Sequence, residues 1–241
     1  MSEYEFSTET RERLETVSVA TLATALYKRG LRNQVIQDVR PVGRKGFNMV
    51  GPAFTLRYMP AREDRNQLVE FRNPEHPQRH AVETCPPGHV MVMDSRKSAT
   101  AASAGDILVT RLMMRGVAGV VTDGGFRDAM NIAELDMPTY HNRPSSPTNL
   151  TTNEAIDINV PIGCGDAPVF PGDIVVGDDD SVIVIPAHLA EEVALEAVEM
   201  TVFEDFVLSQ VKGGAGIIGL YPATQDATLE AFAKWRAEQG R

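Results

Sequence analysis

Residues 105–129, GDILVTRLMMRGVAGVVTDGGFRDA, place a helix start, an apolar strand and a charged turn in one short stretch. The pattern predicts a helix from about 103 to 115 and a buried strand at 116–123. A second helix follows from about 126 to 134. Because HVMVMD at 89–94 supplies an earlier strand, the order is βαβα, which predicts parallel pairing and an α/β fold.

The flanking segments extend this pattern. Apolar residues at near-helical spacing predict helical structure from 7 to about 30, and glycine- and proline-punctuated runs predict strands between 34 and 60. Two further helices are predicted at about 187–212 and 224–238. The GAGIIG stretch at 214–219 matches GxGxxG but follows a helix instead of a strand, so a turn is favoured over dinucleotide binding.

Residues 60–88, PAREDRNQLVEFRNPEHPQRHAVETCPPG, differ in composition from the rest of the chain. Prolines, acids and bases concentrate there, which predicts a long surface excursion with a solvated loop as the default. Basic side chains of this loop are candidates for recognising the distal end of a substrate, namely Arg62, Arg65, Arg72, His76 and His80. His89, His141 and His188 have no partner at metal-ligand spacing, and His141 is expected in a loop.

Composition limits the classes of function. The chain has 241 residues, 43% of them hydrophobic, which predicts one domain over 1–241 with a full core. Acidic residues outnumber basic ones 33 to 23, so we expect no nucleic-acid partner. The N-terminal MSEYEFSTETRERLE lacks a signal-peptide core, and no apolar run reaches membrane-spanning length, which predicts a cytoplasmic protein with no membrane partner. The two cysteines, Cys85 and Cys164, have no metal or disulfide pattern.

The triple aspartate at 178–180 lies between two β-branched runs, so a hairpin turn is favoured over a calcium loop, whose ligand spacing it lacks. The helix start near Gly105 is more informative. Unpaired amides at a helix N-terminus form an anion site, and Arg127 can add a planar cation that grips a carboxylate. Asp128 is a hard oxygen donor suited to Mg²⁺ or Mn²⁺.

Two interpretations of the Arg127–Asp128 pair remain open at this point. In the first, the two side chains and the helix amides bind a metal-chelated 2-oxo acid. In the second, they cap the following helix and form an ordinary surface ion pair. Gly124 and Gly125 are expected to let the chain turn between the strand and this pair.

The segment GDILVTRLMMRGVAGVVTDGGFRDA resembles the signature of the RraA-like family, which includes the class II 4-hydroxy-4-methyl-2-oxoglutarate/4-carboxy-4-hydroxy-2-oxoadipate aldolases. The GD-x-L-type helix start, the glycine-flanked strand, the G-x-x-R-D-type turn and the 22-residue step from Gly105 to Arg127 carry the resemblance. GPAFTL, PPGHVMVMD and PGDIVVGDDDSVIVIP resemble relatives more weakly, and residues 58–80 depart from the shorter members. The resemblance implies a layered α/β/α (β/β/α) sandwich with extra N- and C-terminal helices, the C-terminal extension starting at about 187.

The resemblance also implies roles for site residues. A pyruvyl carboxylate would be bound by Arg127 and by the backbone at Gly105, Asp106, Ile107 and Leu108. Asp128 would ligate the divalent metal, Mg²⁺ or Mn²⁺, and Asp106 would orient water at the metal. Family aldolases bring a glutamate from a neighbouring subunit's C-terminal helix, for which Glu204 is the candidate, with Glu199 and Asp205 as competitors.

The implied activity is a metal-dependent lyase that cleaves a 4-hydroxy-2-oxo acid to pyruvate and a carbonyl product and also decarboxylates oxaloacetate. The implied assembly is a homotrimer or hexamer with sites between subunits. Two alternatives stay open: a protein regulator of RNase E, as some RraA relatives are, and a metal-dependent hydrolase or hydratase of 2-oxo or 2,4-dioxo acids.

Overall fold

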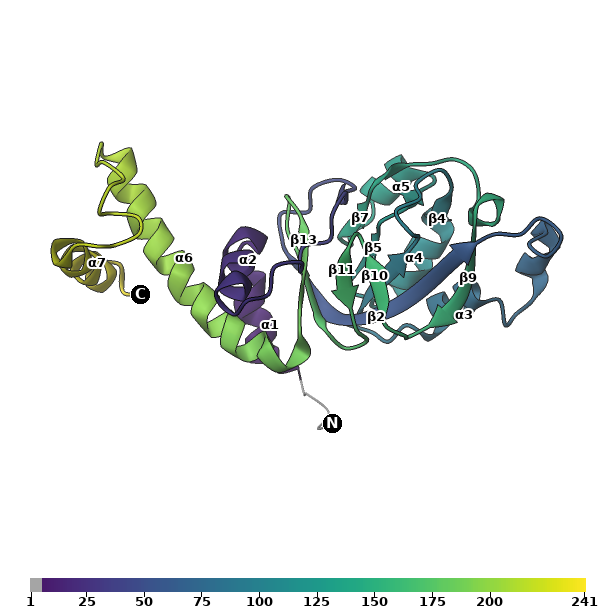
Figure 1. The fold of residues 1–241 in the computed structure, drawn as a ribbon, viewed down its shortest axis with the longest axis horizontal. Coiled ribbons are helices and arrows are strands. Elements are labelled where there is room, and N and C mark those ends of the chain that lie inside the picture. Colours follow the sequence, from purple (N-terminus) through teal and green to yellow (C-terminus); the bar gives the residue numbers. More distant parts are fainter. Residues whose placement is uncertain (1–5) are drawn as a thin grey trace.

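The computed structural model describes residues 6–241, so the first five residues of the segment that we interpreted as lacking a signal-peptide core lie outside it. Figure 1 shows a mixed sheet flanked by helices, with a long helix leading to the C-terminus at the opposite end of the molecule. The strands of the main sheet, in spatial order, are β1 (Arg40–Pro41), β7 (Thr139–His141), β5 (Gly119–Thr122), β3 (Val90–Asp94), β2 (Met49–Pro60), β12 (Ile174–Gly177) and β13 (Val182–Ile185), with β9 (Asn153–Ile158) also pairing with β2.

The predicted parallel pairing is confirmed only for the centre of this sheet. β2, β3, β5 and β7 run parallel, whereas β1, β9, β12 and β13 pair antiparallel to their neighbours. A purely parallel sheet is therefore wrong, because β13 joins β12 through a hairpin and β1, β9 and β12 pair antiparallel with strands distant in the sequence. The layered α/β architecture itself is confirmed.

Each face of the sheet carries its own core. Along β3, Met91 and Met93 pack toward one layer while Val90 and Val92 pack toward the other, as the period of two in a strand requires. The first layer consists of α3 (Pro77–Thr84), α4 (Asp106–Met114) and α5 (Ala129–Ala133); the second is the hairpin of β10 (Ile162–Cys164) and β11 (Ala167–Val169).

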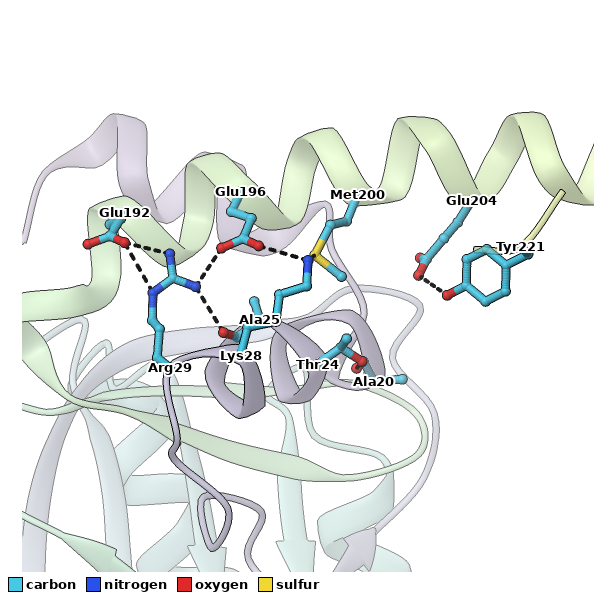
Figure 2. Close-up of polar contacts among 10 residues, drawn as sticks. All are labelled: Ala20, Thr24, Ala25, Lys28, Arg29, Glu192, Glu196, Met200, Glu204 and Tyr221. Atoms are coloured by element: carbon cyan, nitrogen blue, oxygen red, sulfur yellow. Dashed lines mark hydrogen bonds and ion pairs between the residues drawn. The ribbon is translucent and has the colours of Figure 1, made fainter. Parts of the chain in front are cut away.

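A third core joins the terminal helices to the sheet edge. Here α1 (Thr8–Glu15), α2 (Val19–Lys28) and α6 (Ala190–Lys212, after the 3-10 turn η3 at Ala187–Leu189) pack on β12 and β13. Figure 2 shows Arg29, the C-cap residue of α2, between Glu192 and Glu196 of α6, and Lys28 donating to Glu196. Beyond this core, α6 continues to α7 (Asp226–Gln239), which packs on it through a small aromatic cluster.

The residues at 60–88 are not a solvated loop throughout. They contain a 3-10 helix, η1 (Leu68–Arg72), and α3, whose Ala81 and Val82 are buried in the main core together with Cys85. The composition of this segment suggested a loop because prolines and charged residues surround the short apolar face of α3. His141 likewise lies in strand β7 and not in a loop, with its side chain 4% exposed.

The predicted turns at 178–181 and 214–219 are confirmed. Asp178 accepts hydrogen bonds from the amides of Asp180 and Ser181 in the β12–β13 hairpin, and also from the amide of Val19 at the start of α2. GAGIIG follows the end of α6, where Gly214 and Gly219 adopt positive φ angles. No helix within residues 6–241 is both long and apolar enough to span a bilayer.

Candidate functional site

A small parallel sheet brings the predicted site residues together. It contains β4 (Ala102–Ala104), β6 (Gly125–Phe126) and β8 (Arg143–Pro144). Ala104 pairs with Phe126, so the next residue on each strand, Gly105 and Arg127, leave the sheet side by side. The amide of Arg127 donates to the carbonyl of Ala104 at 3.1 Å. The 22-residue step in the sequence is therefore the register of this strand pair.

Gly105 is required here for space. A Cβ atom at Gly105 would lie 2.7 Å from Cγ and 3.0 Å from Cδ of Arg127, and 3.3 Å from Oδ2 of Asp128. Its backbone is extended (φ −122°), so the left-handed region is not the reason for glycine. The missing side chain lets the arginine stem lie directly against the start of α4.

Gly124 and Gly125 serve packing in the same way. A Cβ at Gly124 would lie 2.6 Å from Cβ of Ser95, and one at Gly125 would lie 2.6 Å from Cβ of Ser145. Neither glycine has a positive φ angle. The chain bends at Asp123 and Gly124 as expected, but glycine is needed for the close approach of neighbouring segments and not for the backbone angles of this bend.

The N-terminus of α4 supplies amides to the site. The helix begins at Asp106 and not near 103, with Gly105 as the capping residue and no side-chain cap. Within the described part of the chain, the amides of Asp106 and Leu108 have no hydrogen-bond partner. The amide of Ile107 is occupied, because it donates to Oδ1 of Asp106 at 2.8 Å. Three of the four predicted backbone positions, Gly105 among them, thus stay open to a ligand.

Asp106 is held from both sides. Its Oδ2 accepts a hydrogen bond of 2.8 Å from Nδ2 of Asn131 on α5, while Oδ1 accepts from the Ile107 amide. The carboxylate is therefore oriented before any ligand binds. Asn131 was not predicted as a site residue, because nothing in the sequence pairs it with Asp106.

Arg127 and Asp128 form an ion pair, with 3.4 Å between Nε and Oδ2, and their side chains are 49% and 42% exposed. Asp128 occupies the N-cap position of α5, yet its side chain makes no capping hydrogen bond. Its backbone is left-handed, with φ 57°, a conformation that costs free energy in residues other than glycine. The capping interpretation is therefore wrong for Asp128, and its carboxylate remains available to a ligand.

These residues line one cavity of about 390 Å³. Its wall includes all of the predicted substrate-binding positions and Asp128. It also includes side chains that the sequence analysis did not assign to the site, namely Phe71, Gln78, Arg79, Thr148 and Asn149. Arg79 lies in the segment 60–88, whose concentration of basic residues could have identified it as a candidate. Thr148 and Asn149 belong to no sequence pattern that predicts a binding site.

The structure does not bring the predicted distal residues to the cavity. Arg62, Arg65, Arg72 and His80 are exposed, and none of them lines it. Arg62 pairs instead with Asp64 at 2.6 Å. His76 is buried, where desolvation lowers the pKa of its imidazole, and it too lies outside the cavity wall.

A buried carboxylate supports the loop that carries the site. Asp123, at the end of β5, accepts hydrogen bonds from the amides of Ser95 (2.7 Å), Lys97 (3.0 Å) and Gly165 (3.1 Å). Burial raises its pKa although the three amides favour the ionised form. Asp123 thus joins three loops at the sheet end from which Arg127 projects.

The C-terminal acids lie away from this cavity within one chain. Figure 1 shows α6 on the far side of the sheet from α4 and α5. Glu204 accepts hydrogen bonds from Thr21 (2.9 Å) and from Tyr221 (3.2 Å; Figure 2). Glu199 pairs with Arg236, and Asp205 with Arg241.

The donor set limits which metal fits. Within residues 6–241, no three His, Cys, Asp or Glu side chains gather at metal-binding distance, which disfavours a protein cage of the kind that zinc or calcium prefers. Mg²⁺ is commonly held by one or two carboxylates and completes its shell with water and substrate oxygens. Asp128, with Asp106 on the same wall, fits that pattern.

The fold and the cavity define a layered α/β protein with a cavity lined by two arginines, two aspartates and the N-terminus of α4. The Aldolase/RraA family pattern matches residues 19–184, and the chain belongs to the RraA-like family. It is 32% identical over 196 residues to a Halalkalibacterium halodurans protein named "Putative 4-hydroxy-4-methyl-2-oxoglutarate aldolase", covering 81% of this chain and 83% of that one.

Solved structures agree with this assignment. Streptomyces coelicolor RraAS2, described as an unusual member of the RNase ES inhibitor RraA protein family, is 30% identical with a TM-score of 0.74, covering 84% of this chain and 96% of that chain. An uncharacterised protein from Pseudomonas syringae shares the fold with a TM-score of 0.78 at 22% identity, covering 92% and 97% of the two chains.

Proposed function

We propose that this chain is a divalent-metal-dependent aldolase that cleaves a 4-hydroxy-2-oxo acid to pyruvate and a carbonyl product, and that it decarboxylates oxaloacetate at the same site. The observation that carries the proposal is the meeting of Arg127, Asp128 and the α4 N-terminus in one cavity. An arginine fork and helix amides suit a carboxylate, and an adjacent acid suits a hard cation. The aldolase name of the Halalkalibacterium relative supports the same reaction class.

The residues divide the chemistry as follows. Arg127 and the amides of Asp106 and Leu108 bind the substrate carboxylate and orient the 2-oxo group. When C3–C4 cleaves, its electron pair remains on the pyruvyl fragment as an enolate, whose charge Arg127 stabilises. Asp128 would hold the cation, which supplies a Lewis acid that draws electron density from the 2-oxo group.

Two protons also move. The 4-hydroxyl proton leaves as the carbonyl product forms, and Asp106, oriented by Asn131 and the Ile107 amide, is the carboxylate that accepts it directly or through one water. A proton is then returned to C3 of the enolate, which gives pyruvate. Loss of CO₂ from oxaloacetate produces the same enolate, so one set of residues serves both reactions.

We further propose a homotrimer or hexamer in which Glu204 of one subunit approaches the cavity of the next. Exposed apolar side chains on the α6–α7 arm support an intersubunit contact, among them Leu208 (51% exposed) and Ile218 (94%). Glu204 would then exchange its bond to Tyr221 for one across the interface. Light scattering on the full chain tests this, and a monomer at micromolar concentration would contradict it.

The activity is tested by pyruvate release from 4-hydroxy-2-oxo acids and oxaloacetate, with and without chelator and added Mg²⁺. Arg127→Ala should lower kcat/KM by about 30- to several-thousand-fold, the effect of about 2–5 kcal/mol from an unpaired bound carboxylate. Asp128→Ala should abolish metal-dependent turnover and leave the fold intact. Arg111→Ala, which breaks an exposed ion pair between α4 and Glu83 of α3, is the control.

A second candidate, a protein regulator of RNase E-type enzymes, is supported by the similarity to Streptomyces coelicolor RraAS2 of the RNase ES inhibitor RraA protein family. No pyruvate from any substrate, together with inhibition of RNase E, would replace the aldolase proposal with this one. Products other than pyruvate and a carbonyl compound would instead favour the hydrolase or hydratase alternative. The three outcomes are separated by chromatography of the reaction products and one RNA-cleavage assay.

A further inference from the structure

Arg79 occupies a position that local helix energetics disfavour. It is the third residue of α3, and the first turn of this helix contains no acid. The positive end of the helix dipole makes a cation there unfavourable. A residue that conflicts with its local setting without an evident structural gain is a candidate for function.

The partners of Arg79 leave its charge unneutralised. Its guanidinium lies over the ring of Phe71, 4.5 Å from the centroid, and Nη1 donates to Oε1 of Gln78 at 3.3 Å. Among residues 6–241 no carboxylate lies within ion-pair distance of it. The exposed Arg62, by contrast, has Asp64, and partial burial lowers the pKa of Arg79.

The guanidinium is also held in place. Gln78 is 2% exposed, and its amide nitrogen donates to the carbonyl of Ser103 at 2.5 Å and to the hydroxyl of Tyr58 at 3.3 Å. These bonds direct the amide oxygen of Gln78 toward Arg79, while the ring of Phe71 fixes the guanidinium plane. A fork oriented in this way loses little conformational entropy when it binds an anion.

The cavity wall contains two arginines and two aspartates, but the arginines differ in their partners. Arg127 has Asp128 at 3.4 Å, whereas Arg79 has no carboxylate within ion-pair distance among the described residues. The other acid, Asp106, is bound to Asn131 and to the Ile107 amide, and Thr148 and Asn149 are neutral. A substrate whose carboxylate head is bound at Arg127 therefore leaves one cation of the cavity wall free for a second anionic group.

We propose that Arg79 determines substrate specificity by binding an anionic group, carboxylate or phosphate, at the distal end of the 2-oxo acid. This inference rests on the proposed function, since it takes the head of the substrate to lie at Arg127. The role that the sequence analysis gave to other basic residues of 60–88 is thereby assigned to Arg79, an oriented arginine of the same segment. Arg79 touches the part of the substrate that does not react.

The test is calorimetric binding to the full chain in Mg²⁺ of three stable 2-oxo acids. 2-Oxoglutarate has a distal carboxylate, 2-oxo-4-phosphonobutanoate a distal phosphonate, and 2-oxopentanoate a methyl group in its place. Wild type should bind at least one of the anionic pair about 10- to 100-fold more tightly than 2-oxopentanoate, as expected for hydrogen bonds to a charged group. The preferred ligand identifies the natural distal group.

In Arg79→Gln the preference should fall to within about 3-fold while the affinity for 2-oxopentanoate is retained, and Arg79→Lys should restore part of it. Arg72→Gln, an exposed arginine of the same segment, should behave as wild type. The melting temperature of Arg79→Gln should not fall, because the helix dipole conflict is removed; a merely structural arginine would lower it.

No anion preference in wild type, or a preference that survives in Arg79→Gln, would overturn the inference. These measurements need no turnover, so the two proposals fail separately. Anion preference without pyruvate formation would reject the aldolase and keep the role of Arg79. Pyruvate formation with equal binding of all three acids would keep the aldolase proposal and reject the role of Arg79.

Discussion

Asp128 adopts a left-handed backbone conformation beside a cation and makes no capping bond. Arg79, at the positive end of α3, has no ion-pair partner among the residues that the structure describes. Each arrangement costs stability and is retained in the same cavity wall. Strain and unpaired charge that coincide at one cavity are typical of binding sites. Positive φ angles also occur at five other non-glycine residues that do not line this cavity, so only the coincidence of Asp128 with Arg79 and Arg127 distinguishes it.

A buried histidine makes stability depend on pH. His141 packs near Phe126, with 5.6 Å between ring centroids, and its Nδ1 has no hydrogen-bond partner within residues 6–241. Burial, with a smaller contribution from Arg40, lowers its pKa to about 4 from 6.5. The unfolded chain therefore binds more protons than the folded one between about pH 4 and 6.5, so stability falls as pH falls through this window.

Between pH 7 and pH 5, wild type should lose about 2 kcal/mol more unfolding free energy than His141→Gln, a difference set by this pKa shift. Urea unfolding at the two pH values measures it. His80→Gln, which alters an exposed side chain, is the control and should keep the wild-type slope. Equal slopes for wild type and His141→Gln would show that the imidazole does not contribute.

The element that builds the site is the β4–β6 strand pair. Its register sets Gly105 beside Arg127, and the lack of a side chain at Gly105 lets the arginine lie over the α4 N-terminus. The rest of the sheet acts as support, with Asp123 joining three loops below the pair. Substrate binding should therefore depend on Gly105, which has no side chain of its own but leaves room for Arg127.

Gly105→Ala should lower kcat/KM by about 10-fold or more, the effect of about 1.4 kcal/mol or more, because the new methyl group displaces the Arg127 stem. Gly163→Ala is the matched control, since a Cβ there meets nothing within 4 Å. Steady-state kinetics and melting temperatures separate a displaced arginine from a damaged fold. Full activity of Gly105→Ala would mean that Arg127 does not bind from this position.

At the scale of the whole molecule, α6 connects the sheet to the C-terminal arm and holds the N-terminal helices against the sheet edge (Figure 1). Arg29, at the end of α2, connects this helix to α6. Its side chain is 18% exposed and forms ion pairs with Glu192 at 2.7 Å and with Glu196 at 2.5 Å. Polar bonds around an apolar core of this kind fix the orientation of a helix more than they add to its burial energy.

Arg29→Ala should lower the free energy of unfolding by about 1–2 kcal/mol, more than an exposed pair contributes, because Glu196 is then left partly buried without Arg29. Arg13→Ala removes an exposed pair with Glu9 on α1 and should cost less than about 0.5 kcal/mol. Urea denaturation compares the two variants. Equal effects would indicate that the α2–α6 contact is held by its apolar residues alone.

Helix and strand periodicity and the hairpin at the aspartate turn could be predicted from the sequence, because each depends on local patterns. The fixed spacing also singled out Gly105, Arg127 and Asp128, which the structure brings into one cavity. The antiparallel outer strands, the buried α3 and the place of Arg79 in the cavity wall could not be predicted. They depend on contacts between segments distant in the chain, such as Gln78 with Ser103 and Tyr58. Local chemistry by itself determined which groups can bind an anion; only the tertiary structure decided which of them share a cavity, because strand register and burial are properties of the packed chain.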